Sequence, residues 1–87
     1  MRLILYSKPG CHLCEGLQEK LEQIGSFDLN LEIRDITTRD DWFEAYQYEV
    51  PILTYPQGER EAMIPRPSPR ASVAQLERML QKYFTSE

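Results

Sequence analysis

One stretch decides the fold of this chain, and it reads Leu3-Ile4-Leu5-Tyr6-Ser7-Lys8-Pro9-Gly10-Cys11-His12-Leu13-Cys14. The four apolar residues at its start predict a short strand that is covered on both faces. The next four residues predict a loop, because proline and glycine interrupt regular structure. From Cys11 onward the apolar residues follow a helical period, with an inward stripe, and the helix is expected to end at Gly25. The stripe consists of Cys14, Leu17, Leu21 and Ile24.

The two cysteines of the chain lie three residues apart at the start of this helix. Residues i and i+3 share one helix face, so two sulfurs there can form a disulfide without a backbone rearrangement. The partial positive charge of a helix N-terminus favours a thiolate at Cys11, and we expect its thiol pKa to lie about one to two units below roughly 8.5. The spacing predicts a redox-active dithiol in which Cys11 is the nucleophile and Cys14, one turn further in, is the resolving thiol.

Length, charge and hydropathy limit what the chain can be. Its 87 residues are enough for one domain, residues 1–87, and too few for two. The net charge of −4, without a basic cluster, argues against nucleic-acid binding. No stretch approaches the roughly 18 to 20 apolar residues of a membrane span, and the start lacks a secretory signal. We therefore expect a monomer that binds neither nucleic acid nor membrane. We expect it in the cytoplasm, because a lone cysteine pair suits a reducing compartment.

The middle of the chain predicts a second strand and a short helix. Apolar and polar residues alternate from Phe27 to Arg34, which is typical of a half-buried strand. Thr38 is the expected N-cap of the helix that follows, because Asp40 and Asp41 would then lie in its first turn. The inward-facing residues predicted for this helix are Trp42, Ala45 and Tyr46.

The last part of the chain predicts two strands and a final helix. Ile52–Tyr55 reads as a strand, and the turn Tyr55–Gly58 leads into a weaker strand at Glu59–Ile64. A proline-rich connector follows, and the final helix runs from about Pro69 or Ser72 to Tyr83, with Val73, Leu76, Leu80 and Tyr83 facing inward. The predicted order is βαβαββα, an α/β fold with a right-handed parallel crossover first and an antiparallel pair later.

With the stretch Leu5–Cys14 and the segment Glu49-Val50-Pro51-Ile52-Leu53, the chain resembles a glutaredoxin-like protein of the thioredoxin superfamily. The resemblance covers nearly the whole chain. It implies a thioredoxin fold with a four-stranded mixed sheet and three helices. It also implies that the peptide bond before Pro51 is cis and packs beside the disulfide, and that backbone groups of Val50 pair with an extended peptide or with glutathione.

The chain departs from ordinary glutaredoxins at two places. The residues between the cysteines are His12 and Leu13, where those proteins carry Pro and Tyr. The Gly-Gly turn that holds glutathione before the last helix is replaced by Met63–Arg70, in which Arg66 and Arg70 are candidate anion contacts.

Two charged side chains near the cysteines are candidate helpers. An imidazolium at His12 would stabilise the Cys11 thiolate and make the disulfide more oxidising, and the alternative is an exposed residue at a helix start. Lys8 would support the same thiolate and attract an anionic substrate such as a glutathione carboxylate, and the alternative is plain surface solubility.

The predicted activity is therefore that of a thiol–disulfide oxidoreductase acting on protein disulfides or glutathione mixed disulfides. No bound cofactor is needed, glutathione is a candidate co-substrate, and electrons would come from glutathione or from a reductase. A metal site within one chain is not expected, because a closed zinc site needs four ligands and only one histidine accompanies the two cysteines. Two alternatives stay open: a glutathione-dependent iron–sulfur cluster carrier bridging two chains, and a non-catalytic binding module.

Overall fold

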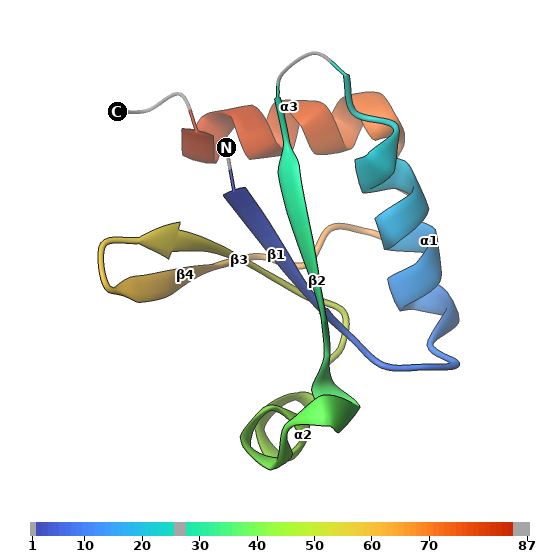
Figure 1. Cartoon of the computed structure of the whole chain (residues 1–87). Coiled ribbons are helices and arrows are strands. Elements are labelled where there is room, and N and C mark those ends of the chain that lie inside the picture. Colours follow the sequence, from blue (N-terminus) through green and yellow to red (C-terminus); the bar gives the residue numbers. More distant parts are fainter. Residues whose placement is uncertain (1, 26–27, 85–87) are drawn as a thin grey trace.

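A computed structural model describes residues 2–25 and 28–84 of the chain (Figure 1). The predicted order of strands and helices is confirmed, with one added turn of 3-10 helix, η1. The elements are β1 (Arg2–Ser7), α1 (His12–Glu22), β2 (Asn30–Asp35), η1 (Ile36–Thr38), α2 (Asp40–Tyr46), β3 (Ile52–Gln57), β4 (Arg60–Ile64) and α3 (Val73–Phe84).

The four strands form one mixed sheet in the order β2-β1-β3-β4. β1 and β2 run parallel, and their register pairs Leu5 with Ile33. β3 runs antiparallel to β1 on one side and to β4 on the other. The β3–β4 hairpin turns at Gly58, whose φ of +65° lies in the left-handed region that glycine adopts at little cost. The parallel crossover and the antiparallel pair expected from the sequence are thus both present.

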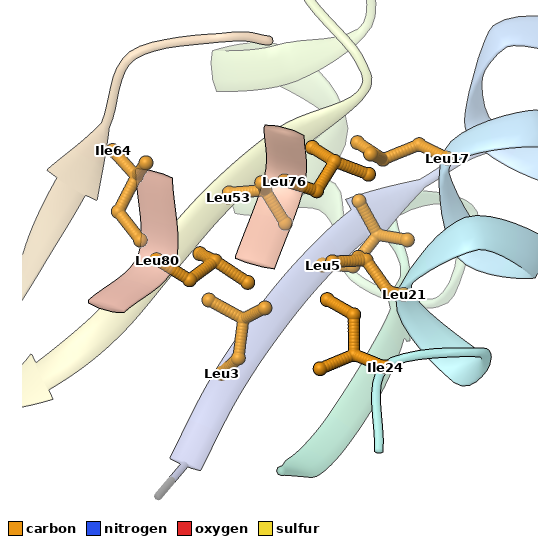
Figure 2. Close-up of a cluster of buried hydrophobic side chains, with 9 residues drawn as sticks. All are labelled: Leu3, Leu5, Leu17, Leu21, Ile24, Leu53, Ile64, Leu76 and Leu80. Atoms are coloured by element: carbon orange, nitrogen blue, oxygen red, sulfur yellow. The ribbon is translucent and has the colours of Figure 1, made fainter. Parts of the chain in front are cut away.

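The apolar run of β1 contributes to two cores, because successive side chains of a strand point to opposite faces of the sheet. Leu3 and Leu5 face α1 and α3, and Ile4 and Tyr6 face α2. Figure 2 shows the larger core, in which α1 and α3 pack over β1, β3 and β4. Its buried members are Leu3, Leu5, Leu17, Leu21, Ile24, Leu53, Ile64, Leu76 and Leu80. The inward stripe predicted for α1 is confirmed, since Cys14, Leu17, Leu21 and Ile24 are all buried.

The start of α2 differs from the sequence prediction. Thr38 is not the N-cap of α2 but the last residue of η1, and its hydroxyl donates to the carbonyl of Asp35. The Asp35 side chain caps η1 instead, accepting from the Thr37 backbone N–H at 2.9 Å. Arg39 then precedes α2 without a side-chain capping bond. An aspartate three residues before Thr38 thus provides the first capping side chain of this segment.

Smaller differences concern helix ends and exposed positions. α1 ends at Glu22 rather than at Gly25, with Gln23 as its C-cap. In α2, Trp42 and Tyr46 pack against the smaller core as predicted, but Ala45 is exposed. The helix has only seven residues and lies beyond the lower end of β2 in Figure 1. Phe27, expected to begin the second strand, lies outside the described residues.

The helices of this structure are short. α3 has 12 residues and α1 has 11, whereas a helix needs about 20 apolar residues to cross a bilayer. Within residues 2–25 and 28–84, no helix meets both the length and the apolarity that spanning requires.

Candidate active site

Cys11 is the N-cap of α1, at the end of the loop that leaves β1 (lower right in Figure 1). The loop turns at Gly10, whose φ is +80°, and the Cys11 N–H donates to the Lys8 carbonyl at 3.1 Å. The Cys11 sulfur accepts a hydrogen bond from the Cys14 backbone N–H at 3.2 Å. Cys11 therefore occupies the position where serine, threonine or aspartate usually caps a helix, and its sulfur faces backbone amides that favour negative charge.

Cys11 and Cys14 are joined by a disulfide, with their Cα atoms 5.3 Å apart. This separation is in the ordinary range for disulfides, as expected for residues one helical turn apart. The two sulfurs differ in access, because Cys11 is half-buried whereas Cys14 is only 2% exposed. An external partner can therefore reach Cys11 more readily than Cys14.

Pro51 lies beside the start of α1, and the Val50–Pro51 peptide bond is cis, as the resemblance implies. His12, Leu13 and Pro51 line a common groove with a volume of about 240 Å³. We call this the α1 groove, and its remaining lining residues are Gly16, Leu17, Lys20, Arg66, Pro67 and Pro69. The fold thus brings the two residues between the cysteines together with a proline that is 39 and 38 positions away from them in the sequence.

The backbone of Val50 is partly committed within the molecule. Its N–H donates to the Tyr46 carbonyl at 3.1 Å, and the N–H of Glu49 donates to the same carbonyl at 2.9 Å. A bound peptide or glutathione that pairs with this N–H must therefore displace the Tyr46 carbonyl. The sequence gives no signal for this bond, because it depends on how the chain turns between α2 and β3.

Lys8 points toward the end of α2. Its ammonium donates to the Gln47 carbonyl at 3.5 Å, a long hydrogen bond that links the loop before Cys11 to the segment before Pro51. Lys8 also lines a second groove, of about 250 Å³, together with Cys14. We call it the β2 groove, and its other lining residues are Ser7, Pro9, Glu15, Gln18, Ile33 and Asp35.

His12 projects into solvent, with 94% of its side chain exposed. Its Nδ1 lies 3.7 Å from Glu15 Oε2, one helical turn away. A protonated imidazole would therefore interact with the Glu15 carboxylate as well as with the Cys11 region. The structure leaves the electrostatic role of His12 as a prediction.

Two basic residues connect the proline-rich segment to the rest of the site. The Lys20 ammonium, on α1, donates to the carbonyls of Pro69 at 2.8 Å and Ala71 at 2.7 Å. The Arg66 guanidinium donates to the Glu49 carbonyl. Arg66 was singled out in the sequence as an anion contact, but Lys20 was not. Its position on α1 gives no local signal, because its partners come from a segment 49 and 51 residues away.

A polar network on the α2 face of the sheet was also missed from the sequence. The Tyr6 hydroxyl donates to Glu61 at 2.7 Å and accepts from Arg34 at 2.8 Å, and the Thr54 hydroxyl donates to Glu61 at 2.8 Å. The Arg34 guanidinium also lies 5.4 Å from the centre of the Trp42 ring. Burial, reinforced by the Glu61 hydrogen bond, raises the pKa of Tyr6 to about 12. The network joins side chains from all four strands.

Metal ligands do not gather anywhere in the described part of the chain: no three His, Cys, Asp or Glu side chains lie together so as to hold an ion.

The order of the elements, the mixed sheet and the disulfide at the start of α1 define a thioredoxin-like α/β fold. Residues 2–81 match the family model described as Glutaredoxin-like domain (DUF836). The chain therefore belongs to this glutaredoxin-like family.

Two solved structures resemble the chain over almost its whole length. The structural-genomics target protein XcR50 from X. campestris is 29% identical, with a TM-score of 0.65, covering 92% of this chain and 96% of its own. Thioredoxin 1 from Thermosipho africanus TCF52B is 18% identical, with a TM-score of 0.66, covering 98% of this chain and 96% of its own. The second likeness supports the fold alone. No curated protein matches the sequence.

Proposed function

We propose that this protein is a thiol–disulfide oxidoreductase that reduces protein disulfides or glutathione mixed disulfides through Cys11 and Cys14. One observation carries the proposal. An accessible sulfur caps α1 and accepts a backbone hydrogen bond at 3.2 Å, while its disulfide partner is buried directly behind it. This arrangement stabilises one thiolate selectively and keeps a second thiol within bonding distance of it.

The first step is an attack by the Cys11 thiolate on one sulfur of the substrate disulfide. The new bond joins Cys11 Sγ to that sulfur, the substrate S–S bond breaks, and the other substrate sulfur leaves as a thiolate that takes a proton from water. The N-terminal amides of α1 hold the attacking sulfur as an anion before this step.

The second step is an attack by Cys14 on the sulfur of Cys11. Cys14 loses its proton, a bond forms between the two cysteine sulfurs, and the substrate leaves as its second thiol. The substrate has gained two electrons and the protein has lost two. The final state of the pair is the disulfide that this structure contains.

The reduced dithiol must then be regenerated by an external reductant. We propose a thiol donor, glutathione or a dithiol reductase, which reverses the two exchange steps. Both steps use only cysteine sulfurs, so the cycle requires no resident cofactor. A monomer contains every residue that the cycle uses.

The residues proposed to hold the substrate are Lys8, Val50 and Pro51. Pro51 lines the α1 groove together with His12 and Leu13, and the Val50 carbonyl is proposed to pair with the substrate backbone, because the Val50 N–H is already donated to Tyr46. Lys8 is proposed to contact an anionic substrate group. Its 3.5 Å bond to a neutral carbonyl is weak, so a carboxylate can replace that partner.

The test is steady-state reduction of a protein disulfide and of a glutathione mixed disulfide by the wild type and two variants. Cys11→Ser is expected to abolish turnover with both substrates. Cys14→Ser should accumulate a mixed disulfide at Cys11, visible as a mass increase equal to the substrate thiol. Activity of Cys11→Ser equal to that of the wild type would contradict the proposal. It would instead favour a binding module, which does not need the thiol.

A further inference from the structure

The α1 groove continues away from the disulfide along the helix. Leu13, Leu17 and Lys20 mark its length on α1, and the helix rises about 10 Å from Leu13 to Lys20. Its opposite wall is the proline-rich segment, with Pro67 and Pro69. The groove therefore begins at His12 and Leu13, the two residues between the cysteines, and extends along the helix to Lys20.

Apolar side chains form most of the walls of this groove. Leu13 is 50% exposed although it lies between the two cysteines, and Leu17, Pro51, Pro67 and Pro69 add further apolar surface. Covering an exposed leucine at the edge of an apolar groove lowers the free energy of the complex, because apolar surface is removed from water. The groove thus favours a ligand that carries an apolar side chain.

The charged residues of the groove are all basic. Lys20 and Arg66 line it, and no aspartate or glutamate is among its lining residues, although the whole chain has a net charge of −4. Both basic side chains donate to backbone carbonyls, which are neutral, so their charges are not cancelled by these bonds. A ligand with a carboxylate is complementary to this wall.

These two properties distinguish a polypeptide from glutathione. Glutathione has two carboxylates but no side chain apart from its cysteine thiol, so it matches the charges and leaves the apolar walls uncovered. A polypeptide whose cysteine has an apolar neighbour and an acidic residue matches both.

We infer that the α1 groove selects protein disulfides in which an apolar side chain and an acidic side chain follow the reactive cysteine. The apolar side chain lies against Leu13 and Leu17, and the carboxylate lies near Lys20 and Arg66. This inference rests on the proposed function, because it assigns the substrate of the same cysteines.

The test uses three matched peptides, each linked through its cysteine to 2-nitro-5-thiobenzoate, whose release is followed by absorbance. The peptides contain Cys-Leu-Glu, Cys-Ser-Glu and Cys-Leu-Lys. Reduced wild-type protein is expected to release the chromophore from Cys-Leu-Glu about 10-fold faster than from Cys-Ser-Glu, and faster than from Cys-Leu-Lys. Equal rates for the three peptides would overturn the inference and leave the proposed function intact. No release from any peptide would contradict the proposed function itself.

Three variants locate the apolar contact. Leu13→Ser should reduce the leucine-over-serine preference to about 2-fold or less. Met63→Ser is the matched control, because Met63 is an exposed apolar residue of β4 that lines neither groove, and it should keep the wild-type preference. Loss of the preference in Ile33→Ser instead would place the side chain in the β2 groove and overturn the assignment.

Binding without chemistry gives an independent measurement. A peptide with serine in place of cysteine, in the sequence Ser-Leu-Glu, is titrated into isotope-labelled oxidised protein. The largest amide shift changes are expected at Leu13, Leu17 and Lys20. Changes confined to the β2 groove, or no changes at millimolar peptide, would contradict the assignment.

Discussion

At the scale of single residues, the asymmetry between Cys11 and Cys14 is the basis of the proposed chemistry. Both thiols belong to one turn of helix, yet only Cys11 combines access with a backbone N–H donor. Cys14 is one of the buried core residues of α1, so in the proposed cycle the substrate disulfide is attacked by Cys11 first. The sequence predicts that Cys14 is buried, because Cys14 has the helical spacing to Leu17 and Leu21 that places all three residues on one face of α1.

The charges next to the cysteines should tune the pKa of the Cys11 thiol in opposite directions. His12→Gln removes the positive charge that a protonated imidazole would carry and is expected to raise that pKa. Glu15→Gln removes a negative charge and is expected to lower it. Both shifts should be small, because both side chains are mostly exposed and solvent screens them. The measurement is the pH dependence of alkylation at Cys11 in the Cys14→Ser background. A zero shift in His12→Gln would reject the tuning role of His12.

Tyr6 should titrate separately from the other tyrosines. Its pKa is raised to about 12, mainly by burial and further by the Glu61 hydrogen bond. The absorbance change of Tyr6 should therefore occur at a higher pH than that of an ordinary tyrosine, whose pKa is about 10. A group whose folded pKa is raised stabilises the fold below its unfolded pKa and loses that effect as the pH rises through the folded value. The free energy of unfolding should therefore fall between about pH 10 and 12.

Tyr6→Phe is the matching variant for this titration. It should remove the highest-pH component of the absorbance change and much of the alkaline loss of stability. A titration curve identical to that of the wild type would contradict the buried position of the Tyr6 hydroxyl in the network.

At the scale of elements, the proline-rich segment is held to α1 and to the loop before Pro51 by basic side chains. Sequence patterns predict the helices and strands well, since each pattern is local, but they do not predict these bonds. The Lys20 and Arg66 contacts depend on where residues 65–71 pass relative to α1 and to Glu49, and local sequence patterns do not predict this path. The correction at Thr38 has a local cause, because Asp35 offers a capping carboxylate earlier in the chain.

Removing the Lys20 bond should loosen this segment. Lys20→Met keeps the aliphatic stem and removes two donated hydrogen bonds, so the free energy of unfolding should fall by about 1 kcal/mol. Urea denaturation measures the change, and Lys82→Met in the last turn of α3 is the control for loss of a lysine charge. Equal stability of the Lys20 and Lys82 variants would show that the two Lys20 hydrogen bonds contribute nothing to the free energy of unfolding.

The network across the sheet should make stability depend on acid pH. Burial raises the pKa of Glu61, but hydrogen bonds from Tyr6 and Thr54 and the charge of Arg34 outweigh burial and lower it below its ordinary value. A lowered pKa stabilises the fold above the unfolded pKa of about 4.3, and this contribution disappears as the pH falls through the folded value. Glu61→Gln should therefore lose less stability than the wild type on acidification below about pH 4.5. An unchanged acid dependence in this variant would contradict the network.

At the scale of the whole molecule, the fold places Cys11 and Pro51 at the same end of the sheet, where β1 ends and β3 begins. The order of elements, the parallel crossover and the inward stripe of α1 were all predictable, because they follow from periodicity and turn residues. The shape and charge of the α1 groove were not. That groove combines α1 with Pro51 and residues 66–69, which meet only after the sheet has formed.

A single-turnover reaction tests the central claim most directly. Reduced protein is mixed with one equivalent of a protein disulfide, quenched with acid, alkylated and mapped by mass spectrometry. We expect one equivalent of substrate to be reduced while Cys11 and Cys14 become joined to each other, with a transient adduct on Cys11 alone. Cysteines that remain free after the substrate has been consumed, or an adduct on Cys14, would contradict it.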